Sequence, residues 1–96
     1  MRVLLIDDLR VISEATHVAR TYDQGLTALK QGNWDKLLLD HDLGEPEPKN
    51  GYQLLCWIEE QHFLGNHNLV PKKIILVTDN PVGRQKMQMI LQKITI

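Results

Sequence analysis

Acidic side chains directly follow three short apolar runs of the sequence. Asp7-Asp8 follows the first run, Asp40-His41-Asp42 the second and Thr78-Asp79-Asn80 the third. Carboxylates held close together repel one another unless a cation neutralises them, and Mg²⁺ and Mn²⁺ prefer such oxygen ligands. If the three runs end at one place, their polar residues form a site for a divalent cation, and that cation would in turn organise a phosphate group.

Four aspartates of this set are the candidate ligands for Mg²⁺ or Mn²⁺. A single aspartate after a strand is more often a helix cap or a turn residue, so the assignment depends on the coincidence at all three strand ends. For Asp42 and Asp79, a role in a turn and a role in the site stay equally open. The sequence predicts a metal site formed by Asp7, Asp8, Asp40 and Asp42.

His41 stands between two aspartates. Its imidazole either forms a hydrogen bond with a neighbouring carboxylate or acts as a general acid and base, because histidine titrates near neutral pH. Both interpretations stay open at this point. The candidate catalytic residues are Asp40 and His41.

A phosphate group would lie next to the third acidic cluster, where Asn80-Pro81 begins a helix. Asn is a favoured N-cap, Pro is tolerated at the first helical position, and the free amides and positive dipole end of a helix suit an anion. Arg84 and Lys86 lie in the first turns of this helix. The candidate phosphate-binding residues are Thr78, Asn80, Gly83 and Arg84.

Composition and charge limit the other possibilities. The net charge of −1 does not support a general nucleic-acid-binding field, and Cys56, His62 and His67 match no zinc-ligand spacing. The charges are unevenly distributed, because residues 35–60 hold seven acids and two bases whereas residues 71–96 hold five bases and one acid. This asymmetry reflects either solvated faces of helices and loops or a polarised site that holds a cation and an anion together.

The apolar runs themselves predict the strands that would position these residues. Residues 3–6, 36–39 and 74–77 are short runs without alternation and, apart from Lys36, are apolar, a pattern typical of parallel strands covered on both faces. Residues 17–20 form a weaker strand, expected at an edge. The segment between Asp8 and His17 is too short for a crossover helix, since a full connection between parallel strands needs at least ~10–12 residues. Either an irregular loop makes this crossing or the second strand is antiparallel.

Helix signals lie between the predicted strands. Thr21 and Gln24 form a capping box, and that helix is expected to stop at Gly32. Asn50 with Gln53 begins a second helix, which is expected to stop at Gly65, and Asn80-Pro81 begins the third. The sequence therefore predicts an α/β fold of three layers. It has about four mostly parallel strands with helices on both faces, and it lacks a first crossover helix.

With 96 residues, the chain is expected to form one domain over residues 1–96. Residues 3–6 are too short for the ~7–15-residue apolar region of a signal peptide, and no run approaches the ~20 residues of a membrane helix. The single cysteine, Cys56, precludes an internal disulfide and fits a reducing compartment. We expect a cytoplasmic domain that does not engage a membrane. The sequence gives no indication of the oligomeric state.

The motifs resemble those of a known family. Asp7-Asp8, the strand that ends in Asp40 and the strand that ends in Val77-Thr78 resemble the receiver domains of response regulators. That resemblance implies an acidic Mg²⁺ pocket with Asp40 as phosphoryl acceptor and Thr78 as switch hydroxyl. The segments Leu39–Gly44, Asn50–Tyr52 and Asn80–Gly83 resemble more closely the cyclic-phosphate-processing receiver domain. This second resemblance covers nearly the whole chain and implies a metal-dependent phosphoesterase acting on cyclic or terminal phosphates of nucleotides or RNA ends.

The sequence departs from these families at two places. A typical receiver has a fifth strand ending in a lysine, whereas only residues 94–96 follow the last predicted helix here, so we expect the fold to lack this fifth strand and its lysine. The cyclic-phosphate family usually has a histidine near the end of its fourth strand, where this chain has Thr78-Asp79. An alternative function is therefore a catalytically silent module that binds a protein or a nucleotide, and a third is a domain phosphorylated at Asp40. The expected partner is a phosphate-containing small molecule or a nucleic-acid end.

Overall fold

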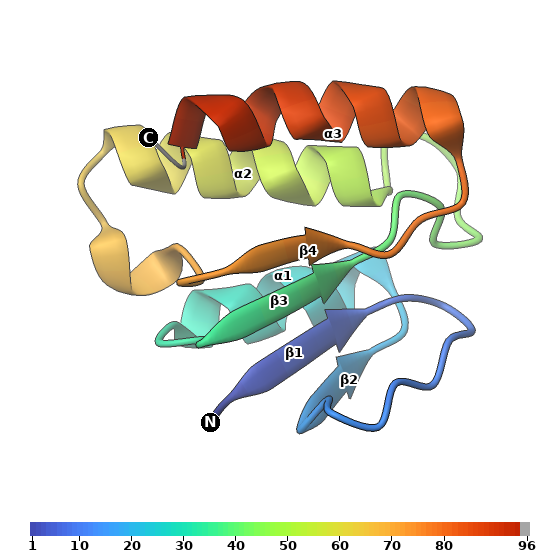
Figure 1. The fold of residues 1–96 in the computed structure, drawn as a ribbon, viewed down its shortest axis with the longest axis horizontal. Coiled ribbons are helices and arrows are strands. Elements are labelled where there is room, and N and C mark those ends of the chain that lie inside the picture. The colour runs from blue at the N-terminus through green and yellow to red at the C-terminus, as the bar shows by residue number, and fades with distance from the viewer. Residues whose placement is uncertain (95–96) are drawn as a thin grey trace.

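The fold is built on a parallel sheet of four strands. The computed structural model describes residues 1–94; residues 95–96, which the sequence predicts to follow the last helix, lie outside the described residues. The strands are β1 (Val3–Ile6), β2 (His17–Ala19), β3 (Lys36–Leu39) and β4 (Ile74–Leu76), in the order β2-β1-β3-β4. All the pairings are parallel, including that of β1 with β2, so the crossing between these two strands is made by an irregular loop (Figure 1).

The register brings the carboxyl ends of the strands to one edge. Ile6 pairs with Ala19 on one side and with Leu39 on the other, and Leu39 pairs with Leu76. The ladder continues one residue further, because Asp7 N donates to Ala19 O at 3.1 Å and Asp40 N donates to Ile6 O at 3.0 Å. Asp7 and Asp40 therefore lie at the same height on adjacent strands.

The three α-helices begin at the caps that the sequence predicted. They are α1 (Tyr22–Gln31), α2 (Gly51–Phe63) and α3 (Pro81–Ile94), and a short 3₁₀ turn, η1 (His67–Leu69), precedes β4. Thr21 accepts a hydrogen bond from Gln24 N at 3.1 Å, and Asn50 accepts one from Gln53 N at 3.0 Å. Side-chain acceptors at these positions satisfy amides that the first turn of a helix leaves free.

All three helices cover the same face of the sheet. Leu4, Ile6, Leu37 and Leu39 point into one core with apolar residues of α1, α2 and α3. Val3, Leu5 and Leu38 point to the opposite face, where Ile12 and Ala15 of the loop between β1 and β2 pack against them.

This arrangement differs from the predicted helices on both faces. A right-handed crossover lies on one face of the sheet when the chain steps to the next strand in one direction across the sheet. It lies on the opposite face when the chain steps in the other direction. The connections from β2 to β3 and from β3 to β4 run in one direction and contain α1 and α2, whereas the connection from β1 to β2 runs back and has no helix. The fold is nonetheless the receiver-like α/β fold that the sequence predicted.

None of the helices within the described residues has the length and apolar character needed to cross a membrane.

Candidate metal and phosphate site

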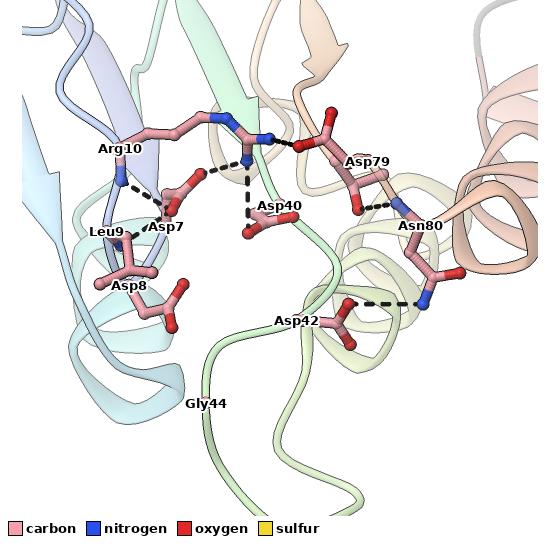
Figure 2. Close-up of a pocket in the computed structure, with 10 residues that line it drawn as sticks. Asp7, Asp8, Leu9, Arg10, Asp40, Asp42, Gly44, Asp79 and Asn80 are labelled. Atoms are coloured by element: carbon pink, nitrogen blue, oxygen red, sulfur yellow. Dashed lines mark hydrogen bonds and ion pairs between the residues drawn. The ribbon is translucent and has the colours of Figure 1, made fainter.

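A cavity of about 430 Å³ lies at the carboxyl edge of the sheet, beyond the ends of β1, β3 and β4. Ligands of open parallel sheets bind in this position, outside the carboxyl ends of the strands. Figure 2 shows the acidic side chains converging on the cavity from three separate parts of the chain. Its lining residues are Asp7, Asp8, Leu9, Arg10, Asp40, Asp42, Gly44, Thr78, Asp79 and Asn80.

Three of the predicted metal ligands meet in this cavity. One carboxylate oxygen from each of Asp7, Asp8 and Asp40 lies within 4.8 Å of the others. Asp7 is 1% exposed and Asp40 is 7% exposed, so two of the three carboxylates are held inside the protein. Asp42, the fourth predicted ligand, also lines the cavity but is exposed and lies outside this close group.

Arg10 crosses the cavity and contacts three of its carboxylates. Arg10 Nη1 lies 2.8 Å from Asp7 Oδ2 and 3.5 Å from Asp40 Oδ2, and Arg10 Nη2 lies 2.6 Å from Asp79 Oδ2 (Figure 2). Arg20 holds the loop beneath it by donating to Arg10 O at 2.6 Å. The guanidinium is thus a cation inside the acidic cluster.

Sequence reasoning did not identify Arg10 as a site residue. A local signal was nevertheless present, because Arg10 follows Asp7 by three residues in a short loop. There Asp7 Oδ1 accepts hydrogen bonds from Leu9 N at 2.9 Å and from Arg10 N at 3.0 Å. An aspartate that receives the amides two and three residues ahead forms a tight turn. That turn brings the side chain three residues later back over the carboxylate.

The environments of Asp7 and Asp40 change their pKa values in opposite directions. Burial acts to raise the pKa of Asp7, but hydrogen bonds from the backbone of Arg10 and Leu9 and from the Arg10 guanidinium outweigh it, so this pKa is lowered. Burial raises the pKa of Asp40, and the neighbouring Asp7 charge adds to the increase. Hydrogen bonds from Thr78 and from the His41 amide and the charge of Arg10 offset it only in part. Of these two carboxylates, Asp40 is therefore the one whose charged form the protein disfavours.

The Asp8 carboxylate is available for a ligand. Within residues 1–94, no hydrogen bond or ion pair engages it. Gly44 lies against it with φ +68°, and a Cβ at Gly44 would lie 3.0 Å from Asp8 Oδ2. A glycine is required at this position by both the positive φ and the close approach.

The donor set fits a hard divalent cation. Oxygens bound to one Mg²⁺ at about 2.1 Å lie about 3 Å apart at right angles and about 4.2 Å apart across the ion, so the oxygens of Asp7, Asp8 and Asp40 would draw together around it. Electrostatics lead to the same conclusion, because five carboxylates and one guanidinium line the cavity and leave it with a formal charge of −4. A phosphate would be repelled by this charge unless a cation neutralised part of it.

His41 lies in a second cavity of about 250 Å³ next to the first. Its Nδ1 is 3.1 Å from Asp42 Oδ1, and because an ionised carboxylate only accepts, Nδ1 is assigned as the donor. The ring packs against Gly83 at the start of α3, where a Cβ would lie 2.5 Å from His41 Cδ2. Gly83 thus provides the space for the imidazole, and it lines the second cavity rather than the first.

Thr78 and Asn80 connect β4 to the site. Thr78 is buried, lines the first cavity and accepts from Asn80 N at 3.1 Å through its hydroxyl. Asn80 lines both cavities. Its Oδ1 accepts from Gly83 N at 3.0 Å, as an N-cap does, and its Nδ2 donates to Asp42 Oδ2 at 3.4 Å. The contact between Asn80 and Asp42 therefore forms the boundary between the two cavities.

Arg84 has a different placement from the one predicted. Its Nη2 donates to Thr78 O at 2.9 Å and to Leu76 O at 3.3 Å, and Arg84 lines neither cavity. The guanidinium thus binds the backbone carbonyls at the end of β4, and it acts on the site by fixing Thr78.

Comparison with known protein families gave one result that covers nearly the whole chain. The sequence profile of the family described as the cyclic-phosphate processing Receiver domain matches residues 2–93. No curated protein matches the chain.

Proposed function

The chain belongs to the family of cyclic-phosphate-processing receiver domains, and we propose that it is a divalent-metal-dependent phosphoesterase that opens or removes cyclic or terminal phosphates on nucleotides or RNA ends. One observation carries this proposal. Asp7, Asp8 and Asp40 bring carboxylate oxygens within 4.8 Å of one another in a cavity wide enough for a phosphate group.

Asp7, Asp8 and Asp40 would hold Mg²⁺ or Mn²⁺. When bound, the cation would withdraw electron density from phosphorus and lower the pKa of a bound water. Asp8 is the ligand most readily recruited, because its carboxylate has no partner within residues 1–94. Asp42 is placed to bind the imidazole of His41 and not to complete the ligand set.

Arg10 and Asn80 would orient the phosphate. A guanidinium donates from several nitrogens in a fixed plane and binds phosphate oxygens well. When the cation binds the carboxylates of Asp7 and Asp40, Arg10 would lose its contacts with them and keep its ion pair with Asp79 at the rim of the cavity. The other nitrogens of the guanidinium would then be free to bind an oxygen of the phosphate. Asn80 lies at the boundary of both cavities and offers its amide to a group that enters either one.

His41 would give a proton to the leaving oxygen. In the hydrolysis of a cyclic phosphate, a water molecule would lose one proton to solvent as its oxygen forms a bond to phosphorus. One ring P–O bond would break, and the freed sugar oxygen would take a proton from His41, which solvent then reprotonates. Asp42 binds Nδ1 of His41, so Nε2 of the protonated ring is the donor. Because His41 faces the second cavity, the ligand would lie across the boundary, with its phosphate in the first cavity and its sugar oxygen in the second.

Turnover of 2′,3′-cyclic nucleotides by the purified protein with Mn²⁺ tests this proposal. Asp40→Asn and His41→Asn should each reduce kcat/KM by ~10²-fold or more. Glu60→Gln, an exposed acid at the far end of α2, is the matched control and should leave the rate unchanged. Turnover that is indifferent to both site substitutions would remove these residues from the mechanism.

A second candidate function is a non-catalytic binding module, and the position of Arg10 favours it. The guanidinium already neutralises part of the charge on Asp7, Asp40 and Asp79. If this ion pairing were permanent, the cluster would need no metal. Calorimetry with Mg²⁺ and Mn²⁺ separates the two functions, because a permanently paired cluster would show no specific binding of either ion.

A further inference from the structure

The second cavity differs in charge from the first. The first is lined by five aspartates and one arginine. The second is lined by one lysine, one glutamate and the imidazole of His41, among amide, apolar and tyrosine side chains. Two adjacent cavities of such different charge would accommodate different parts of one ligand.

Lys86 is the basic group of the second cavity that remains free to bind a ligand. It lies on the exposed side of α3, and within residues 1–94 no hydrogen bond or ion pair engages its ammonium. The acid of this cavity, Glu47, is already engaged, since its Oε2 accepts from Asn50 Nδ2 at 2.9 Å. The Asn50 amide is neutral and leaves the Glu47 charge in place, so the second cavity is formally neutral, whereas the first has a formal charge of −4, and Lys86 is the unpaired cation that an entering anion would meet.

The two cavities share one side chain, that of Asn80, and His41 and Asp42 form a hydrogen-bonded pair across the same boundary. A ligand whose reacting phosphate lies in the first cavity would have its sugar beside Asn80 and His41. The atoms beyond the sugar would then extend into the second cavity toward Lys86.

We propose that the second cavity is a binding site for a second phosphate group of the same ligand, held by Lys86, so that the preferred substrate carries a phosphate on the far side of the sugar from the reacting one. The inference rests on the proposed function for the identity of the first phosphate. A lysine ammonium binds phosphate as a point charge, and a hydrogen bond between charged groups changes affinity by roughly tenfold or more.

Calorimetry in Mg²⁺ with two ligands that carry no cyclic phosphate tests the second site directly, with release of inorganic phosphate followed in parallel so that only binding is compared. The probes are adenosine 3′-phosphate and adenosine 3′,5′-bisphosphate. The bisphosphate should bind roughly tenfold more tightly, and Lys86→Gln should abolish that difference while leaving the affinity for the monophosphate unchanged. Lys93→Gln is the matched control, because it removes the same charge two turns further along α3 and should preserve the difference.

Three results would overturn the inference: equal affinity for the two ligands, a preference that survives in Lys86→Gln, or binding of neither ligand. Inorganic phosphate that binds at Lys86 as tightly as the bisphosphate would also overturn it, because the site would then accept any free anion. Turnover of a 2′,3′-cyclic mononucleotide with no added benefit from a 5′-phosphate would leave the proposed function intact and refute the second site. A preference for the bisphosphate that depends on Lys86, with no turnover of 2′,3′-cyclic nucleotides, would refute the proposed function and leave the second site intact.

Discussion

The guanidinium of Arg10 lies 2.8 Å from the carboxylate of Asp7, inside the group of oxygens that would bind a divalent cation. A second contact of the same nitrogen, at 3.5 Å, reaches Asp40. Arg10 and the cation therefore compete for the same carboxylates, and the metal affinity of the protein depends on how strongly Arg10 is held.

Arg10→Gln should bind Mn²⁺ about tenfold more tightly than the wild type, because the ion no longer has to displace a charge-assisted contact. Isothermal calorimetry measures the difference. Lys30→Gln removes an exposed positive charge from the last turn of α1 and should leave the affinity unchanged. Unchanged or weaker Mn²⁺ binding by Arg10→Gln would show that the guanidinium does not occupy the metal position.

Asp40→Asn should stabilise the metal-free protein at pH 7. Burial and the Asp7 charge raise the pKa of Asp40 above 3.8, so the folded state disfavours its ionised form. A carboxyl group with a raised pKa adds to the stability of the folded state at pH values below its ordinary pKa. This added stability is lost as the pH rises through the raised pKa of the folded protein. Thermal unfolding should show a Tm higher by ~4–8 °C if about 1 kcal/mol is recovered. Saturating Mn²⁺ should reverse the order, and a lower Tm for metal-free Asp40→Asn would contradict this account.

Asp7→Asn should have the opposite effect and destabilise the protein. The pKa of Asp7 is lowered because hydrogen bonds from Arg10 and Leu9 outweigh the effect of burial. The ionised Asp7 therefore stabilises the folded state above pH 3.8, and this stabilisation is lost as the pH falls through the lowered pKa. Chemical denaturation at pH 7 should show a loss of about 1–3 kcal/mol. Asp79→Asn is the control, because the Asp79 side chain is 96% exposed and its ion pair with Arg10 contributes little. Equal tolerance of the two substitutions would be inconsistent with a buried, hydrogen-bonded Asp7.

Gly83→Ala should displace the imidazole of His41, since the added Cβ would lie 2.5 Å from His41 Cδ2. Overpacking of this kind costs about 1–3 kcal/mol, and the ring has to rotate away from Asp42. The imidazole resonances of His41 should shift, and kcat should decrease while Mn²⁺ affinity stays the same. Met89→Ala, at an exposed position of α3 that lines neither the first nor the second cavity, is the control. Unperturbed His41 resonances in Gly83→Ala would show that the two residues do not pack as described.

The sequence predicted the elements of this fold because the signals for them are local. Continuous apolar runs identified β1, β3 and β4, and the side chains of Thr21 and Asn50 identified the helix starts. The face that each helix covers is not a local property. It follows from the strand order and the hand of each crossover, which the pattern of residues between 8 and 17 left open.

The site was predictable only in part, for a related reason. Asp7, Asp8 and Asp40 could be grouped because parallel strands end at one edge, and the structure brings them together. The position of Arg10 depends on a turn closed by the Asp7 side chain, and the role of Arg84 depends on the path of the backbone after β4. The spacing of Asp7 and Arg10 indicates the turn but not the path of the guanidinium, and no residue spacing indicates the path of the backbone after β4.

Anomalous diffraction from a crystal soaked in Mn²⁺ tests most directly whether Asp7, Asp8 and Asp40 bind the ion. We expect one Mn²⁺ ion about 2.1 Å from oxygens of Asp7, Asp8 and Asp40. The Arg10 guanidinium should have moved away from Asp7 and Asp40 and should still pair with Asp79. A saturating soak that leaves Arg10 in contact with Asp7, with Mn²⁺ absent from these three carboxylates, would contradict this expectation.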